Sequence, residues 1–184
     1  PVVIQAATSG IGIKAVAGGE IDTTATPLID IIVSPKSDIN GPADLEGKRI
    51  GSPAVNGIIH LLTLAWIKDQ GGDPSKVTAV QVPFASMADQ LSQGKVDAVE
   101  TAAPVQQKLI ASGFKSLGDP AQVLGNPVST MQTVWASSGT WATANKATVK
   151  KFVAALTEAD AYIASHKDEA IAALSKASGI TLDQ

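Results

Sequence analysis

The segment Ser-Asp-Ile-Asn-Gly-Pro-Ala-Asp-Leu-Glu-Gly-Lys-Arg-Ile-Gly, residues 37–51, is the most informative stretch of this chain. Because proline is tolerated in the first turn of a helix, Pro42 predicts a short helix that ends near Gly47. Residues 49–52 follow at once and have the pattern of a strand, while 34–40 form a polar turn before the helix. The segment therefore predicts a turn, a short helix and a strand in close succession.

On both sides of this segment, apolar runs of strand length alternate with segments of helical periodicity, which predicts an α/β fold with a largely parallel sheet. The expected strands are 2–6, 21–24, 28–33, 49–52, 77–82, 96–100, 114–117 and 130–136. The expected helices are 8–18, 42–47, 58–70, 86–93, 105–112, 149–163 and 167–179. Hydroxyl side chains precede several of these helices and are expected to cap them, namely Thr8 or Ser9, Ser86 with Asp89, and Ser165 with Asp168.

Composition excludes several classes of function. The 184 residues carry a formal net charge of -3 and no cysteine, so thiol nucleophiles, thiolate metal sites and disulfides are excluded. Lysine and arginine form no basic face, which argues against a nucleic-acid partner. No apolar stretch reaches the roughly 18 residues that a membrane span needs. The chain begins at Pro1 with no leader, which we interpret as a processed or truncated chain.

Four segments, in this order, resemble type II periplasmic solute-binding proteins of the nitrate/sulfonate/taurine group, which includes binders of the thiamin pyrimidine precursor. The segments are 15–22, 37–51, 90–99 and 149–179. The resemblance implies a two-lobed α/β fold with lobe one at residues 1–33 and 135–184 and lobe two at 34–134. Compared with that family, the chain lacks the first strand-helix-strand of lobe one, and the junction at Thr26-Pro27 is short.

The same resemblance implies a substrate-binding component of an ABC importer. Such a protein captures a small polar or anionic organic solute in the cleft between its lobes by hinged closure. It uses no cofactor and no metal, works as a monomer, and delivers its small-molecule ligand to ABC permease subunits at the membrane. It is exported, either free in the periplasm or lipid-anchored outside the cell.

Ligands of open α/β sheets lie beyond the carboxyl ends of strands, beside the N-termini of helices, where free N–H groups favour an anion or a polar acceptor. The candidate ligand-binding residues therefore come from strand-to-helix junctions, with one tryptophan near the second lobe crossing. They are Thr8, Ser9, Gly10, Thr24, Ser52, Val55, Asn56, Gly57, Phe84, Ser86, Glu100, Thr101 and Trp135. Each also has a structural interpretation: the serines as ordinary caps, Phe84 and Trp135 as packing residues.

Glu100 narrows the choice of ligand. A carboxylate at the end of a buried strand is costly without a partner, so Glu100 is expected to receive an amine or ring N–H of the ligand, to pair with a lysine, or to lie in solvent. If Glu100 faces the ligand, a bare dianion is a poor candidate. The single arginine, Arg49, begins a strand and so lies at the wrong end for a clamp on sulfonate or phosphate.

Enzymatic and regulatory alternatives stay open. Relatives on the same fold that act in pyrimidine synthesis or desulfination work through cysteine, which this chain lacks. His60 and His166 have no acidic or histidine neighbours at metal-ligand spacing, and no Gly-x-Ser-x-Gly motif is present. The effector-sensing domain of a transcription regulator shares the fold and would carry a helix-turn-helix before Pro1.

Overall fold

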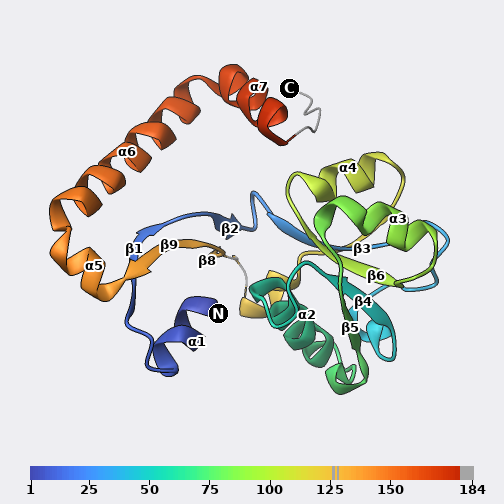
Figure 1. The fold of residues 1–184 in the computed structure, drawn as a ribbon. Helices are drawn as coiled ribbons and strands as arrows, with labels where there is room; N and C mark the ends of the chain where they lie inside the picture. The colour runs from blue at the N-terminus through green and yellow to red at the C-terminus, as the bar shows by residue number, and fades with distance from the viewer. Residues whose placement is uncertain (126, 128, 179–184) are drawn as a thin grey trace. The chain divides into compact units, whose positions relative to one another are not determined.

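The computed structural model describes residues 1–125, 127 and 129–178 and divides the chain into two compact units (Figure 1). Unit 1 consists of Pro1 and Glu20–Gln132, and unit 2 of Val2–Gly19 and Thr133–Gln184. The chain therefore passes between the units at 19–20 and at 132–133.

Unit 1 is built on a five-stranded sheet with the order β5-β4-β6-β3-β7. Its strands are β3 (Ile29–Val33), β4 (Arg49–Ser52), β5 (Thr78–Gln81), β6 (Ala98–Ala102) and β7 (Lys115–Gly118). β4 pairs in parallel with β5 and β6, whereas β3 pairs antiparallel with β6 and β7. Four strands thus run in one direction and β3 runs in the other, which confirms the mixed, mostly parallel sheet expected from the sequence.

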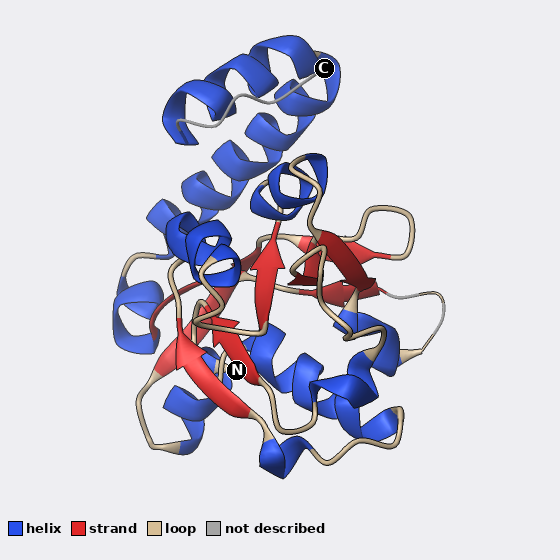
Figure 2. Cartoon of the chain, turned by 90° about the vertical axis from the view of Figure 1, so that its right-hand side faces the viewer, coloured by secondary structure: helices blue, strands red, loops and turns tan. Residues whose placement is uncertain are grey.

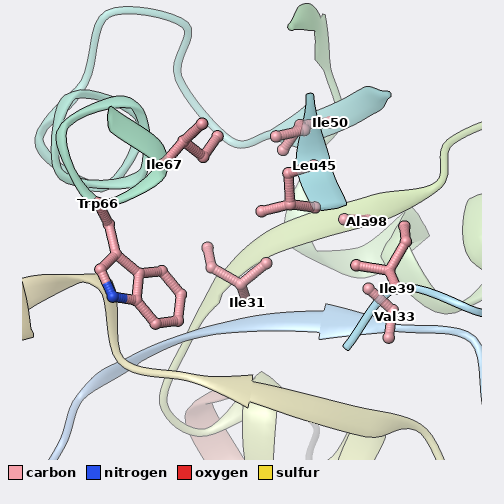
Figure 3. Packing of buried hydrophobic residues seen from close by; sticks show 8 residues of the cluster. All are labelled: Ile31, Val33, Ile39, Leu45, Ile50, Trp66, Ile67 and Ala98. Carbon is pink, nitrogen blue, oxygen red and sulfur yellow. The ribbon is translucent and has the colours of Figure 1, made fainter. Parts of the chain in front are cut away.

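Helices cover both faces of this sheet. The twelve-residue α2 (Ile58–Asp69) and the 3-10 helix η1 (Pro42–Leu45) cover one face, and α3 (Met87–Ser92) and α4 (Val105–Ala111) cover the other (Figures 1 and 2). Under α2 the sheet buries Ile31, Ile50 and Ala98 against Trp66 and Ile67 (Figure 3). The opposite core contains Ile32, Val82, Met87, Leu91, Val96, Val99 and Leu109. Alternate residues of β3 and β6 enter opposite cores, as the two-residue period of a strand requires.

The remaining elements of unit 1 are short. β2 (Ile21–Thr23) pairs antiparallel with β8 (Ser129–Met131). Three further 3-10 helices are η2 (Pro74–Lys76), η3 (Phe84–Ser86) and η4 (Pro120–Leu124), and η4 packs against α2.

Unit 2 pairs β1 (Ile13–Gly18) antiparallel with β9 (Val134–Ser138). Its helices are α1 (Val2–Thr8), α5 (Gly139–Ala144), α6 (Lys146–Ser165) and α7 (Lys167–Ser178). Within the described part of unit 2, Ala142 is the one buried residue. The apolar stripe expected on 149–163 is present on α6, but its side chains are at most half-buried. Across the described residues, no helix combines the length and apolarity needed to cross a membrane.

The N-terminal elements predicted from the sequence are wrong. Residues 2–6 form part of helix α1 rather than a strand, and 13–18 form strand β1 where a helix was expected. A short apolar run does not distinguish strand from helix by periodicity. Residues 13–18 form a strand because they pair with β9, which lies about 120 positions further along the chain. Local sequence patterns do not predict such a distant partner.

Smaller differences concern boundaries and caps. The expected strand 130–136 is divided into β8 and β9. The Ser86 hydroxyl makes no capping hydrogen bond and instead donates to the Pro83 carbonyl oxygen at 3.0 Å. The Ser165 hydroxyl donates backwards to carbonyl oxygens of α6 and does not cap the last helix. The expected end of that helix, Gly179, lies outside the described residues.

Residues 20–33 belong to unit 1, whereas the sequence analysis placed them with the segments of lobe one. β3 is buried along its whole length between β6 and β7 and therefore cannot be separated from them. The assignment of the two lobes of a binding protein stays a prediction.

Candidate functional site

The loop after β4 leads from a buried strand to the N-terminus of α2. Ser52 ends β4 and is fully buried. Asn56 adopts a φ of 66°, a conformation that non-glycine residues rarely take. At Gly57 a Cβ atom would lie 2.7 Å from the Ala54 carbonyl oxygen, so this turn requires glycine. The tight turn positions the loop directly over the first turn of α2.

The first turn of α2 leaves backbone N–H groups unused. No side chain caps Gly57, and the first N–H to bond within the helix is that of Leu61, which donates to the Gly57 carbonyl oxygen at 3.0 Å. The preceding N–H groups of an α-helix have no intrahelical acceptor and face toward the positive end of the helix dipole. Such a terminus favours an anionic or acceptor group.

On the neighbouring strand β6, Glu100 and Thr101 are both fully buried, and Glu100 lies in the middle of the strand rather than at its end as expected. His60, in the first turn of α2 and 4% exposed, places its Nδ1 2.8 Å from Glu100 Oε1. This hydrogen bond ties α2 to β6. The protein partner of Glu100 is therefore a histidine, and not the lysine or the solvent expected from the sequence. Ligand contact at Glu100 stays a prediction.

Three buried polar atoms of β4 and β6 have no hydrogen-bond partner among the described residues. They are Ser52 Oγ, Glu100 Oε2 and Thr101 Oγ1. A buried polar atom without a partner costs about 1–3 kcal/mol, and native structures keep few of them. By strand alternation Ser52 and Glu100 point to the face that α2 covers and Thr101 to the other face, so Ser52 and Glu100 mark the candidate site of unit 1.

The other predicted residues of unit 1 surround this site less closely. Val55 lies in the loop before Asn56 and is 40% exposed, and Phe84 in η3 is 37% exposed. Phe84 belongs to none of the buried clusters. Thr24 lies in the wall of a cavity that also contains two aspartates. Ser86 lies in η3 with Phe84, and its hydroxyl donates to the Pro83 carbonyl oxygen.

Arg49 lies where the sequence indicated, at the start of β4 and so at the opposite edge. Its guanidinium binds both carboxylate oxygens of Asp97, with Nη2 2.8 Å from Oδ1 and Nε 3.0 Å from Oδ2. The Arg49 guanidinium lowers the pKa of Asp97. This pair fastens the start of β4 to the start of β6 and supplies no cation to the candidate site.

Four predicted residues lie in unit 2, and three of them have a different setting from the one expected. Thr8 ends helix α1, and Ser9 and Gly10 form the turn after it, so this junction is the C-terminus of a helix and not an N-terminus. The anion-binding argument therefore does not apply there. Trp135 is half-exposed on β9, contacts Phe152 edge-to-face with ring centroids 5.4 Å apart, and lines a cavity of about 240 Å³.

His60 is the site residue whose role the sequence did not reveal. The signal in the sequence was the position of His60. It lies four residues after Asn56, about one turn into a helix that buries its apolar side chains. Its partner Glu100 is 40 residues away, so the pair depends on the packing of α2 on β6. The described part of the chain contains no group of three or more metal-ligating side chains placed to hold a metal ion.

Comparison with known proteins gives a consistent relationship. The alkanesulfonate-binding protein SsuA from Xanthomonas axonopodis pv. citri, bound to MOPS, matches with a TM-score of 0.79 and 26% identity over 98% of this chain and 59% of its own. The periplasmic aliphatic sulphonate binding protein SsuA from Escherichia coli matches with a TM-score of 0.75 and 23% identity over 95% of this chain and 57% of its own. The desulfurization enzyme DSZB shares the fold at a TM-score of 0.58 and 19% identity, over 92% of this chain and 60% of its own.

The chain therefore spans less than two thirds of the length of these solved relatives. No curated protein is a significant match to the sequence. The family model described as NMT1/THI5 like matches residues 1–170, which is most of the chain. This chain is a member of the NMT1/THI5-like family and has the fold of type II solute-binding proteins.

Proposed function

We propose that this chain is the substrate-binding component of an ABC importer, and that it captures a small organic solute with a polar or anionic end. Two structural matches are named as sulfonate-binding proteins, and both cover nearly all of this chain. The observation that carries the proposal is the pair of buried, unpartnered oxygen atoms, Ser52 Oγ and Glu100 Oε2, on the face of the sheet that α2 covers. A bound solute supplies hydrogen-bond partners to these atoms, which the protein's own side chains leave unsatisfied.

The N-terminus of α2 is the part of the site suited to an acceptor group. Its free N–H groups and the glycine-dependent turn at 54–57 provide donors without a bulky side chain in the way. His60 and Glu100 stabilise the position of this helix end relative to β6. The solute is therefore oriented by main-chain donors and the Asn56 side chain rather than by an arginine.

We further propose that the chain performs no reaction on its ligand. A nucleophilic hydroxyl would need a base within hydrogen-bond distance. The hydrogen bond recorded for the His60 ring joins it to Glu100, while the Ser52 and Thr101 hydroxyls have no partner among the described residues. The partners of the chain are then the ligand and the permease subunits, and its location is outside the cytoplasmic membrane, as for the periplasmic proteins that it resembles.

Thermal unfolding in the presence of candidate solutes tests the proposal. The panel comprises alkanesulfonates, inorganic anions, pyrimidines and aromatic carboxylates. A true ligand at about 100 times its Kd adds about 2.7 kcal/mol to the stability, which raises Tm by several degrees. Asn56→Gly removes the loop side chain and keeps its positive φ, and Asn40→Gly, at the opposite edge of the sheet, is the control.

The expected result is one solute class that stabilises the wild type and Asn40→Gly but stabilises Asn56→Gly much less. A well-folded protein that no member of the panel stabilises would contradict the proposal. So would equal stabilisation of both variants, because the ligand would then bind away from the 52–57 loop.

A further inference from the structure

Unit 1 contains a second feature that the site above does not use, a cavity of about 640 Å³. Its wall is formed by the segment after β2, the start of β3, the end of β7 and η4, and includes Thr24, Asp30, Ser116, Gly118, Asp119 and Gln122. All of these residues belong to unit 1. The volume is within the range of small-molecule sites.

Two buried carboxylates face this cavity. Asp30 is 7% exposed and Asp119 is 8% exposed. Asp30 accepts hydrogen bonds from Ser116 Oγ at 2.7 Å and from the Gly118 N–H at 3.1 Å. Asp119 Oδ1 accepts one from the Ala121 N–H at 2.7 Å. All these donors are neutral, so neither carboxylate is neutralised by its hydrogen bonds.

No basic side chain compensates this charge. The ion pairs of the described residues join Arg49 to Asp97, His60 to Glu100, and Lys76 to Glu46 and Asp73. A third buried carboxylate, Asp22, lies near enough to act on Asp119. The cavity is therefore acidic and unbalanced within the described part of the chain.

The carboxylates resist ionisation in this setting. Burial raises the pKa of Asp30, against the opposing effect of its hydrogen bonds. Burial, together with the charges of Asp22 and Asp30, raises the pKa of Asp119 to about 6. A shift of this kind means that the folded protein holds negative charge at neutral pH in a place that disfavours it. An incoming cation would be stabilised there, and an anion would be repelled.

The neighbouring strand adds an independent observation. Thr101 is the register partner of Asp30 in the β3–β6 pair, and its fully buried hydroxyl oxygen has no hydrogen-bond partner among the described residues. Directly opposed residues of antiparallel strands have Cβ atoms about 5 Å apart. An unsatisfied hydroxyl thus lies beside the acidic cavity.

We propose that this cavity binds an organic ammonium group, so that the solute captured by this chain carries a protonated amine held by Asp30 and Asp119. The inference rests on the solute-binding function proposed above and names the chemical class of the ligand. The occupant is an organic cation and not a metal ion, because the described residues bring together no set of side chains fit to hold a metal. An ammonium group donates up to three hydrogen bonds, which two carboxylates and neighbouring hydroxyls can accept.

Matched pairs of compounds test this inference by calorimetric titration of the 184-residue chain at pH 7.5. Each pair differs only in an amine or a hydroxyl: 2-aminoethanesulfonate against 2-hydroxyethanesulfonate, benzylamine against benzyl alcohol, and butylamine against butanol. Each compound is titrated into the wild type, Asp119→Asn, Asp30→Asn and the control Asp69→Asn, which changes an exposed carboxylate on α2. Asparagine retains the acceptor for the Ala121 N–H, so Asp119→Asn is expected to fold.

We expect the amine of at least one pair to bind about 10- to 100-fold more tightly than its alcohol, as for hydrogen bonds to a charged group. Asp119→Asn and Asp30→Asn should each remove most of that ratio, and Asp69→Asn should leave it unchanged. Amine and alcohol that bind equally, or a ratio unaffected by both aspartate variants, would overturn the inference and leave solute binding intact. If no ammonium compound binds in the titration, the inference is overturned as well. The solute-binding proposal is contradicted only if, in addition, no solute of the thermal-unfolding panel stabilises the protein.

Discussion

Replacing Asp119 by asparagine should make the ligand-free protein more stable at pH 8. The carboxyl has a pKa of about 6 in the folded chain, compared with the ordinary value of 3.8, because burial and the neighbouring Asp22 and Asp30 disfavour its charged form. Between about pH 4 and pH 6 the folded chain therefore holds more protons than the unfolded chain, and its stability falls as the pH rises through that window. The loss is complete by about pH 7, one unit above the folded pKa.

The size of the effect follows from the two pKa values. A shift from 3.8 to about 6 corresponds to at most about 3 kcal/mol. The carboxylate lines a water-accessible cavity, so solvent screening reduces this figure, and we expect about 1–2 kcal/mol. For a chain of this length each kcal/mol changes Tm by about 2–4 °C. Asp119→Asn should therefore raise Tm at pH 8 by about 2–8 °C, since the amide still accepts the Ala121 N–H.

Differential scanning calorimetry at pH 4.5 and pH 8, without ligand, measures this difference. At pH 4.5 Asp119 is protonated in the folded wild type but mostly ionised in the unfolded chain, so about a third of the difference remains and Asp119→Asn should raise Tm by only about 1–3 °C. Asp69→Asn, on the exposed surface of α2, should match the wild type at both pH values. A variant that is destabilised at pH 8, or stabilised equally at both, would show that the Asp119 carboxylate is not a source of buried electrostatic strain.

Three further predictions concern the edge beside α2. His60→Ala should destabilise the protein by about 3–5 kcal/mol in urea unfolding, because it leaves the buried Glu100 carboxylate without its partner; a loss below about 1 kcal/mol would mean that this pair does not hold α2 in place. Asn56→Ala should cost about 1–2 kcal/mol while Asn56→Gly costs nothing, since only the alanine is strained at a φ of 66°; equal unfolding midpoints would refute the backbone argument. Gly57→Ala should abolish ligand stabilisation in the thermal assay, because its Cβ would lie 2.7 Å from the Ala54 carbonyl oxygen and must displace the loop; retained binding would remove the 52–57 loop from the site.

The central sheet was predictable because the chain marks it with strong local signals. Gly47, expected near the end of the short helix that Pro42 begins, adopts a positive φ of 74° just after that helix. Buried apolar runs such as 29–33 and 98–102 fill two cores and leave little freedom in their register. Where a core requires apolar residues at regular spacing, that spacing predicts the element from the sequence.

Unit 2 shows the opposite case. Its described residues include a single buried side chain, Ala142, so no core imposes a period of two on 13–18 or of 3.6 on 2–8. The sequence of α1 is rich in β-branched residues, which by propensity favour a strand. Local preference was therefore a poor guide where burial did not constrain the chain.

The candidate site divides in the same way. Ser52 ends its strand as the local strand-to-helix pattern predicted, whereas Glu100, expected to end its strand, lies in the middle of β6. The partner of Glu100 and the acidic cavity were not predictable. Asp30 and Gly118 are 88 residues apart, and their contact exists only because β7 pairs with β3. The one sequence signal for Asp30 was a charge inside an otherwise apolar strand.

The two polar regions of unit 1 share one pair of strands but lie on opposite faces of the sheet. In the β3–β6 register, Asp30 opposes Thr101 and the next pair joins Ile31 to Glu100. Neighbouring residues of a strand point to opposite faces, so Asp30 faces away from the His60–Glu100 pair under α2. The cavity beside Asp30 favours a cation, whereas the N-terminus of α2 favours an acceptor or an anion. Keeping Asp119 charged at neutral pH costs the ligand-free fold stability, and a cation bound beside it would lower that cost.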